Sequence, residues 1–82
     1  KLLEGKQDAE VVAKHTLKNS KTVEVIGCYT HMYSEDGSVE ELRLDWYEIH
    51  DAKTGKCLST EVWYPDEDGE PTIQQLNDVF GA

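Results

Sequence analysis

The spacing of apolar positions predicts a helix near the start of the chain. Between Asp8 and Asn19, apolar or small residues recur every three or four positions, which is typical of one face of a helix. These positions are Ala9, Val12, Ala13, Thr16 and Leu17. Asp8 is a suitable N-cap, and Asn19 with Ser20 suits the end of a helix. We therefore predict an N-terminal helix over residues 8–19.

The following residues have the pattern of antiparallel strands. Residues 22–33 are rich in β-branched and aromatic side chains, as strands are. Segments typical of tight turns follow at residues 34–38 and 51–56, where Gly37 and Gly55 supply left-handed backbone positions. We predict three strands over residues 22–33, 39–50 and 57–64, joined as a meander.

A second helix is predicted at the end of the chain. Thr72 followed by Gln75 forms a capping box, and Gly81 stands where a helix ends. The apolar side of this helix consists of Ile73, Leu76, Val79 and Phe80. The predicted fold class is therefore α+β: a three-stranded antiparallel meander flanked by an N-terminal and a C-terminal helix, in the order α-β-β-β-α.

The two faces of the predicted sheet differ in character. A register through the turn at residues 35–37 makes one face the core, with the pairs Ile26–Trp46, Cys28–Leu44 and Thr30–Leu42. The reverse face is mixed and too apolar for solvent alone. It carries Val23, Val25, Tyr29, His31 and Tyr33 opposite Glu41, Arg43, Asp45, Tyr47 and Ile49.

The aromatic residues exceed what such a core can hold. Apolar alternation changes phase between Trp46 and Tyr47, which indicates a β-bulge there or a strand covered on both sides. Two short helices cover only one face of a three-stranded sheet. We therefore predict that Tyr29, Tyr33 and Tyr47 are surplus to the core, with Trp63 as a further candidate.

Length and composition indicate one small domain over residues 1–82. The chain has 82 residues, of which 38% are apolar, and no apolar run long enough for a membrane span or a signal peptide. We predict a soluble domain, and the lack of a targeting segment favours a cytoplasmic location. A domain of this size has modest stability unless a covalent cross-link such as a disulfide, or self-association, stabilises it.

The cysteine and histidine residues are candidates for a disulfide bond or for a metal site. Cys28 and Cys57 are read as buried free thiols, with a disulfide in an oxidising compartment as the alternative. Residues 28–31 read C-x-x-H, and His50 with Cys57 would complete a set of two cysteines and two histidines. In a strand, however, Cys28 and His31 point to opposite faces, so no metal site is predicted. The acidic segment 66–70 lacks the spacing of an EF-hand and is predicted to be a solvated loop.

Charge is distributed unevenly along the chain. The net charge is −9, and residues 24–51 hold eight carboxylates with Arg43 as their one base, a balance of −7. Residues 1–23 instead hold five lysines and three carboxylates. Phosphate binding requires clustered Lys and Arg, so we predict no direct binding of nucleic acid or of an anionic membrane. Acidity that serves solubility alone remains an alternative.

These features predict a protein-binding function. Carboxylates spaced along a hairpin resemble a phosphate backbone, and phage-encoded inhibitors of restriction and CRISPR enzymes are often small acidic domains of this type. The predicted function is an acidic inhibitor or adaptor, a nucleic-acid mimic that occupies the basic surface of a larger protein. The predicted partner-binding residues are Tyr29, Tyr33, Glu35, Asp36, Glu40, Glu41, Asp45, Tyr47 and Glu48. A structural homodimer that buries the reverse face is the alternative.

Catalysis has little support in the sequence. A hydrolytic site needs a nucleophile near a histidine that a carboxylate orients, and no nucleophile elbow or local catalytic signature occurs. A pair between His31 and Glu41 across the strands would be structural. The glycines form no phosphate-binding loop. We predict neither enzymatic activity nor a cofactor.

The segment from Tyr47 to Leu58 (YEIHDAKTGKCL), which follows the predicted first helix and hairpin, resembles a PepSY domain. The resemblance covers about a dozen residues and implies an envelope or secreted regulatory or inhibitory module. In that family the motif tends to close the unit, whereas here a further strand and helix are predicted to follow. The resemblance is therefore kept as an alternative to the acidic inhibitor.

Overall fold

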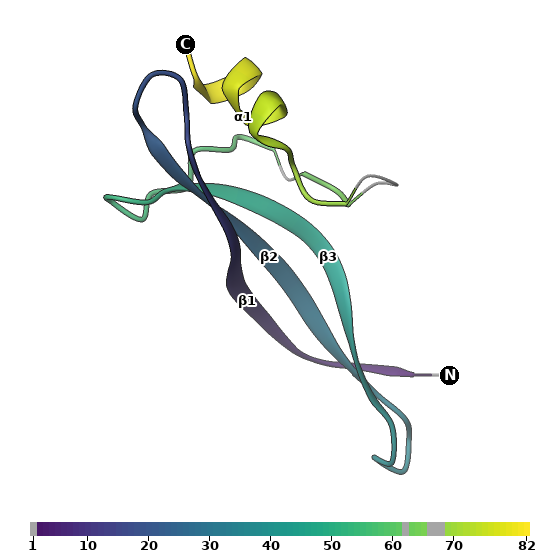
Figure 1. The fold of residues 1–82 in the computed structure, drawn as a ribbon. Helices are drawn as coiled ribbons and strands as arrows, with labels where there is room; N and C mark the ends of the chain where they lie inside the picture. The colour runs from purple at the N-terminus through teal and green to yellow at the C-terminus, as the bar shows by residue number, and fades with distance from the viewer. Residues whose placement is uncertain (1, 62, 66–68) are drawn as a thin grey trace.

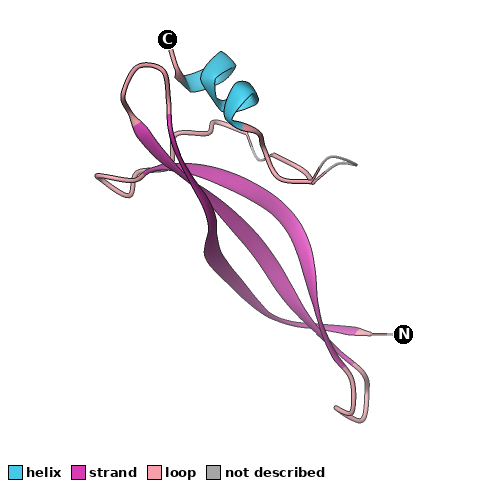
Figure 2. Cartoon of the chain, in the orientation of Figure 1, coloured by secondary structure: helices cyan, strands magenta, loops and turns pink. Residues whose placement is uncertain are grey.

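The described residues form one three-stranded antiparallel sheet followed by a short helix (Figures 1 and 2). The computed structural model describes residues 2–61, 63–65 and 69–82. Strands β1 (Leu3–Thr16), β2 (Thr22–Tyr33) and β3 (Glu40–Asp51) lie side by side in chain order, and α1 spans Ile73–Phe80. The molecule is elongated, with principal extents of 50 × 27 × 19 Å. No helix among these residues has the length and apolar character needed to cross a membrane.

The predicted N-terminal helix is wrong, because the first segment is the long edge strand β1. Ala13 pairs with Val25 and His15 with Val23, so backbone groups that a helix would satisfy internally bond to β2 instead. The residues assigned to the helix end form a tight turn, in which Ser20 has a φ of 70° and Leu17 N–H donates to Lys21 O at 2.7 Å. A short apolar run fits both periodicities, and pairing with β2 decides between them.

The predicted third strand at residues 57–64 is also wrong for the described part of that segment. It touches β3 through two isolated bridges, between His50 and Cys57 and between Tyr47 and Trp63. Next to the first bridge, the Ser59 hydroxyl accepts the Ile49 N–H at 3.2 Å, so a side chain replaces a backbone partner. The meander is thus formed by β1, β2 and β3, one strand earlier in the chain than predicted.

Both predicted turns are confirmed, but the register between β2 and β3 differs from the prediction. Gly37 and Gly55 have φ values of 75° and 76°. Ser34 N–H donates to Val39 O at 3.0 Å, so the turn holds four residues where the prediction had three. Between the turn and residue 45, this shift of one residue exchanges the faces of β3 relative to β2, because side chains alternate; beyond residue 45 the shift is two residues and the predicted faces are kept. The observed pairs are Ile26–Glu48, Cys28–Trp46 and Thr30–Arg43.

A β-bulge in the middle of β3 changes the alternation once more. Cys28 pairs with Trp46 and Tyr29 pairs with Leu44, so Asp45 is the extra residue. The bulge lies one step before the position that the change of phase predicted. On either side of it, the apolar residues of β3 reach the same face of the sheet, namely Leu42, Leu44, Tyr47 and Ile49.

The core lies on the face that was predicted to be the reverse one. Its buried residues come from the β1–β2 turn, β2, β3 and α1: Leu17, Val23, Val25, Tyr47, Ile49 and Leu76. The predicted C-terminal helix is confirmed, including the capping box between Thr72 and Gln75. Lys18 N–H donates to Asn77 Oδ1 at 2.8 Å, which holds α1 against the β1–β2 turn.

The helix covers only one end of the sheet (Figure 1). We call the covered part the proximal half, residues 12–27 and 47–61, and the remainder the distal half, residues 2–11 and 28–46. The distal half ends at the β2–β3 turn, on the side of the molecule away from α1 (Figure 1). The same face of the sheet is therefore core in one half and uncovered by α1 in the other.

Candidate functional site

The core face continues into the distal half as an apolar and aromatic surface. We call this surface the distal face and define it by Leu3, Tyr29, His31, Tyr33 and Leu42. Strand register places them together: Leu3 pairs with Tyr33, and His31 pairs with Leu42. Leu3 is 48% exposed and Leu42 is 58% exposed, and the other three are half-buried. A group of exposed apolar side chains of this kind is typical of a surface where a protein binds a partner.

Two glycines bring the tyrosine rings close to the sheet. A Cβ on Gly5 would overlap Tyr33 Cε2, and a Cβ on Gly27 would lie 2.9 Å from the Tyr29 hydroxyl oxygen. Each ring therefore lies over a glycine, in space that a Cβ would occupy. Burial raises the pKa of the Tyr29 hydroxyl, so this group stays protonated and polar at neutral pH.

His31 sits at the centre of the distal face between two carboxylates. Its Nδ1 lies 3.2 Å from Glu40 Oε1 on β3, and its Nε2 lies 3.7 Å from Asp8 Oδ2 on β1. The ring also stacks on Tyr33, with 6.4 Å between centroids and 13° between planes. The predicted pair of His31 with Glu41 is wrong, because Glu41 pairs with Met32 on the other face. The observed contacts hold the imidazole in place among the aromatic residues.

Carboxylates greatly outnumber basic residues in the distal half of the sheet. The distal half holds eight of them against Lys6 and Arg43, a balance of −6. They are Glu4, Asp8, Glu10, Glu35, Asp36, Glu40, Glu41 and Asp45. Arg43 donates to Glu4 at 2.6 Å and to Asp45 at 2.7 Å, so two of these carboxylates neutralise this base on the opposite face of the sheet. The proximal half, with five lysines and four carboxylates, has a balance of +1.

The turn at the distal tip is built around one carboxylate. Asp36 Oδ1 accepts from the Ser38 N–H at 3.0 Å and from the Ser34 and Ser38 hydroxyls at 2.7 Å each. The backbone bond from Ser38, followed by the two hydroxyls, lowers the pKa of Asp36 to about 2. The carboxylate therefore remains charged over the whole neutral and mildly acidic range.

The predicted binding residues are dispersed over four places. Tyr29, Tyr33 and Glu40 belong to the distal face and its border, and Glu35 with Asp36 lies in the adjacent turn. Glu41, Asp45 and Glu48 lie on the opposite face of the sheet. Asp45 accepts from the Thr30 hydroxyl at 2.5 Å, and this bond lowers its pKa. Tyr47 is buried in the core, so its prediction as a surplus aromatic is wrong.

Sequence reasoning missed three members of this site. Leu3, Asp8 and Leu42 were not among the predicted binding residues, although each lies on or against the distal face. Leu3 and Asp8 are on β1, a strand that was not predicted: Asp8 was assigned as the N-cap of a helix, and Leu3 lies before that helix. The face of Leu42 depends on the turn length and the bulge, for which the change of phase at Trp46 was the available signal.

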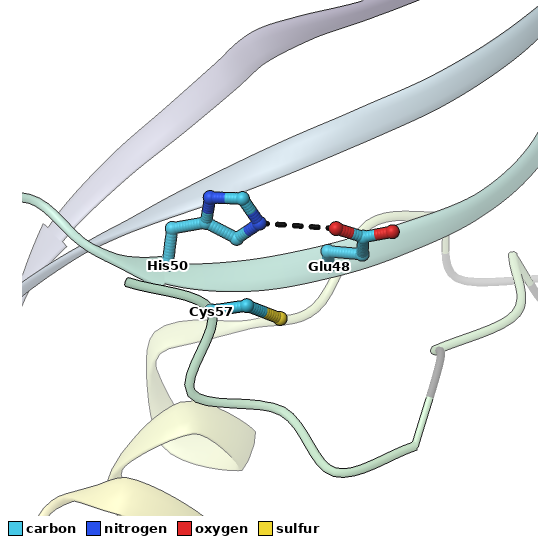
Figure 3. A group of neighbouring side chains, drawn as sticks. All are labelled: Glu48, His50 and Cys57. Atoms are coloured by element: carbon cyan, nitrogen blue, oxygen red, sulfur yellow. Dashed lines mark hydrogen bonds and ion pairs between the residues drawn. The ribbon is translucent and has the colours of Figure 1, made fainter. Parts of the chain in front are cut away.

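A second group of side chains with metal-ligand atoms lies on the opposite face, at the outer edge of β3 (Figure 3). Its members are Glu48, His50 and Cys57, whose ligand-type atoms all lie within 4.8 Å of one another. His50 Nε2 is 3.0 Å from Glu48 Oε1. The bond to His50, followed by the bond from Trp46 Nε1 at 3.1 Å, lowers the pKa of Glu48.

Both cysteines are free thiols, but they are less buried than predicted. Cys28 is half-buried and Cys57 is exposed. The Cys28 thiol lies 3.7 Å from Glu48 Oε2, and burial raises its pKa. Cys28 and His31 point to opposite faces of β2, as strand alternation predicts. The acidic segment considered for calcium includes residues 66–68, which lie outside the described part of the chain.

An apolar groove also opens beside α1. It has a volume of about 570 Å³ and lies between the segment after β3 and the helix, lined in part by Leu58, Trp63, Tyr64, Val79 and Phe80. Trp63 and Phe80 stack across it with 6.2 Å between ring centroids. Trp63 thus packs against the core and is not a surplus aromatic.

Comparisons with models of protein families, with curated proteins and with solved structures found no match. The likeness of residues 47–58 to a PepSY domain therefore remains a sequence resemblance.

Proposed function

We propose that this protein binds a basic surface of a larger protein through its distal face. The observation that carries the proposal is the contrast within one sheet face, which α1 covers proximally and leaves uncovered distally. Exposed apolar side chains surrounded by charge are the usual composition of a protein interface. The bordering carboxylates select a partner of opposite charge, because complementary potentials steer association.

The proposed partner is a nucleic-acid-handling protein, which the domain inhibits by occupying its binding channel. Two features support this finer proposal. The distal half has a balance of −6, which suits a channel lined with lysine and arginine. The molecule is also a rod 50 Å long, with the carboxylates distributed along its distal half. The domain would therefore compete with nucleic acid for the same basic site.

A charge-reversal experiment with a matched control tests the proposal. The distal variant carries Glu10→Lys, Glu35→Lys and Glu40→Lys, and the control carries Glu61→Lys, Glu70→Lys and Asp78→Lys. All six positions are exposed, and both variants change the net charge by the same amount. Each protein is immobilised and used to isolate partners from the source organism at low and at high salt.

The expected result is a partner retained by the wild-type chain and the control and lost by the distal variant. The purified partner should bind less tightly at high salt, because salt screens exposed charges. Nucleic acid should displace the domain from it. Equal retention by all three chains contradicts the proposed surface.

A homodimer is the competing occupant of the distal face. Sedimentation of the wild-type chain and of Leu42→Asp separates the two possibilities. A monomer at all concentrations agrees with the proposal. A dimer that Leu42→Asp dissociates would show that a second copy covers the distal face, and the proposal would be wrong.

A further inference from the structure

The group formed by Glu48, His50 and Cys57 has a geometry that local structure explains. Glu48 and His50 are two positions apart on β3 and therefore point to the same side of the strand (Figure 3). Cys57 bridges to His50 from the segment that runs back along β3. Residues paired across antiparallel strands have neighbouring side chains on one face. Three different ligand types thus meet at one point.

The turn that returns Cys57 to β3 is well defined. Asp51 Oδ1 accepts the N–H groups of Lys53 and Thr54 at 2.8 and 3.1 Å. Gly55 takes the left-handed position with a φ of 76°. Asp51 N–H then donates to Lys56 O at 2.8 Å. Cys57 is therefore held next to His50 by the backbone, before any ligand binds.

We propose that Glu48 Oε1, His50 Nε2 and Cys57 Sγ form a binding site for zinc or a similar divalent transition metal. Thiolate, imidazole and carboxylate are the ligands that proteins offer zinc, and three of them leave a fourth position for water. Tetrahedral bonds of about 2.0–2.3 Å place neighbouring ligand atoms roughly 3.3–3.7 Å apart. The observed separations, 3.0 Å between Glu48 and His50 and at most 4.8 Å for the other pairs, need only small side-chain rotations to reach these values.

The chemistry of the three ligands selects among metals. Calcium and magnesium prefer sites made of oxygen, whereas sulfur and nitrogen ligands favour zinc and its neighbours. On binding, the Cys57 thiol releases its proton to solvent and the thiolate coordinates the ion. Glu48 and Cys57 then contribute two negative charges, which match the ion. The side chains of Glu48 and His50 are 31% and 25% exposed, so the ion can enter directly from solvent.

Two neighbouring groups position Glu48. Trp46 Nε1 donates to Glu48 Oε2 at 3.1 Å, and the Cys28 thiol contacts the same oxygen at 3.7 Å. They leave Oε1 directed at His50. Such partners of a ligand change metal affinity about 10- to 100-fold. Cys28 is therefore a positioning residue, and its loss should weaken the site less than the loss of Cys57.

The experiment titrates the reduced, metal-free protein with Co²⁺ and Zn²⁺. Co²⁺ should give one site per chain, with thiolate charge-transfer absorption in the near ultraviolet, and Zn²⁺ should abolish this absorption. Zn²⁺ should also raise the melting temperature, because it binds the folded chain. Cys57→Ser should remove the charge-transfer band and lower the Zn²⁺ affinity by more than the roughly 10- to 100-fold that loss of an outer partner costs. His50→Gln should lower the affinity similarly.

Two control variants isolate the site. His31→Gln removes a histidine that, like His50, contacts a carboxylate, but on the other face, and this variant should bind Co²⁺ and Zn²⁺ as the wild-type chain does. Cys28→Ser should keep the charge-transfer band. Circular dichroism checks that each variant is folded. Unchanged binding by folded Cys57→Ser, loss of binding in His31→Gln, or the absence of a saturable site in the wild-type chain would each overturn the proposal.

Discussion

The two halves of the sheet have the same face and the same strands, but they differ in what covers them. In the proximal half, α1 and the segment after β3 bury Val23, Val25 and Ile49 completely. In the distal half the same face exposes Leu3 and Leu42 and is bordered by carboxylates. A three-stranded sheet needs cover on its apolar side, and one helix of eight residues supplies it for one half only. The proximal half therefore carries the buried core that stabilises the sheet, and the distal half carries the surface for which we propose partner binding.

The largest predicted effect is a loss of unfolding free energy when the packing of α1 against the sheet is disturbed. Leu76 of α1 is 0% exposed, and Leu76→Ala should lower the free energy of unfolding by about 2–5 kcal/mol. Leu42→Ala, in the distal half, should change it by less than about 0.5 kcal/mol, because the side chain is largely exposed. Val79→Ala controls for the helix, since Val79 is 58% exposed. Urea unfolding measures all three, and a comparable loss for Leu42→Ala would mean that something covers the distal face in solution.

A smaller effect is expected where α1 begins. The Thr72 hydroxyl accepts the Gln75 N–H at 3.2 Å, and the Thr72 N–H donates to Gln75 Oε1 at 2.8 Å. Thr72→Ala removes the first bond and should cost about 0.5–2 kcal/mol of unfolding free energy. Combining it with Gln75→Ala should cost less than the sum of the two single losses, because the two bonds form one capping box. Strict additivity would show that the two bonds act independently, and no loss in Thr72→Ala would show that α1 does not depend on this cap.

The smallest effect belongs to the distal tip and depends on pH. The folded pKa of Asp36, about 2, lies below its ordinary value of 3.8. The stabilising contribution of this carboxylate is therefore fully present above pH 4 and is lost as the pH falls towards 2. Asp36→Ala should be less stable than the wild-type chain at pH 5, and the difference should shrink between pH 4 and pH 2. Urea unfolding at several pH values measures it, and a difference that is constant with pH would contradict the assigned role of Asp36.

Local chemistry in the sequence predicted the features that depend on few residues. Gly37 and Gly55 mark the turns, and Thr72 with Gln75 marks the start of α1. The acidic surplus of the distal half is also a property of the sequence, as is the presence of Tyr29 and Tyr33 near it. The prediction failed for β1, where a run of small and apolar residues fits a helix and a strand equally well. Only the pairing of Ala13 with Val25 and its neighbours settles that choice.

The candidate sites were predictable to a smaller extent than the turns. Tyr47 was expected on the surface and is in the core, because the sheet face that it shares with Val25 and Ile49, predicted to be the reverse one, is the face against which Leu76 of α1 packs. The sequence did not predict the proposed metal site, because His50 and Cys57 were considered as metal ligands only together with Cys28 and His31. Glu48, two positions from His50, is the ligand that the strand brings instead.

The sequence alone therefore determined the turns, the C-terminal helix and the sign of the charge, because each depends on residues that are near one another in the chain. Tertiary structure decided which segment became the edge strand, which face became the core, and which side chains meet in the distal face and beside Cys57. These outcomes depend on register. A shift of one residue moves every side chain of a strand to the opposite face, and register is settled by contacts between segments that are distant in sequence.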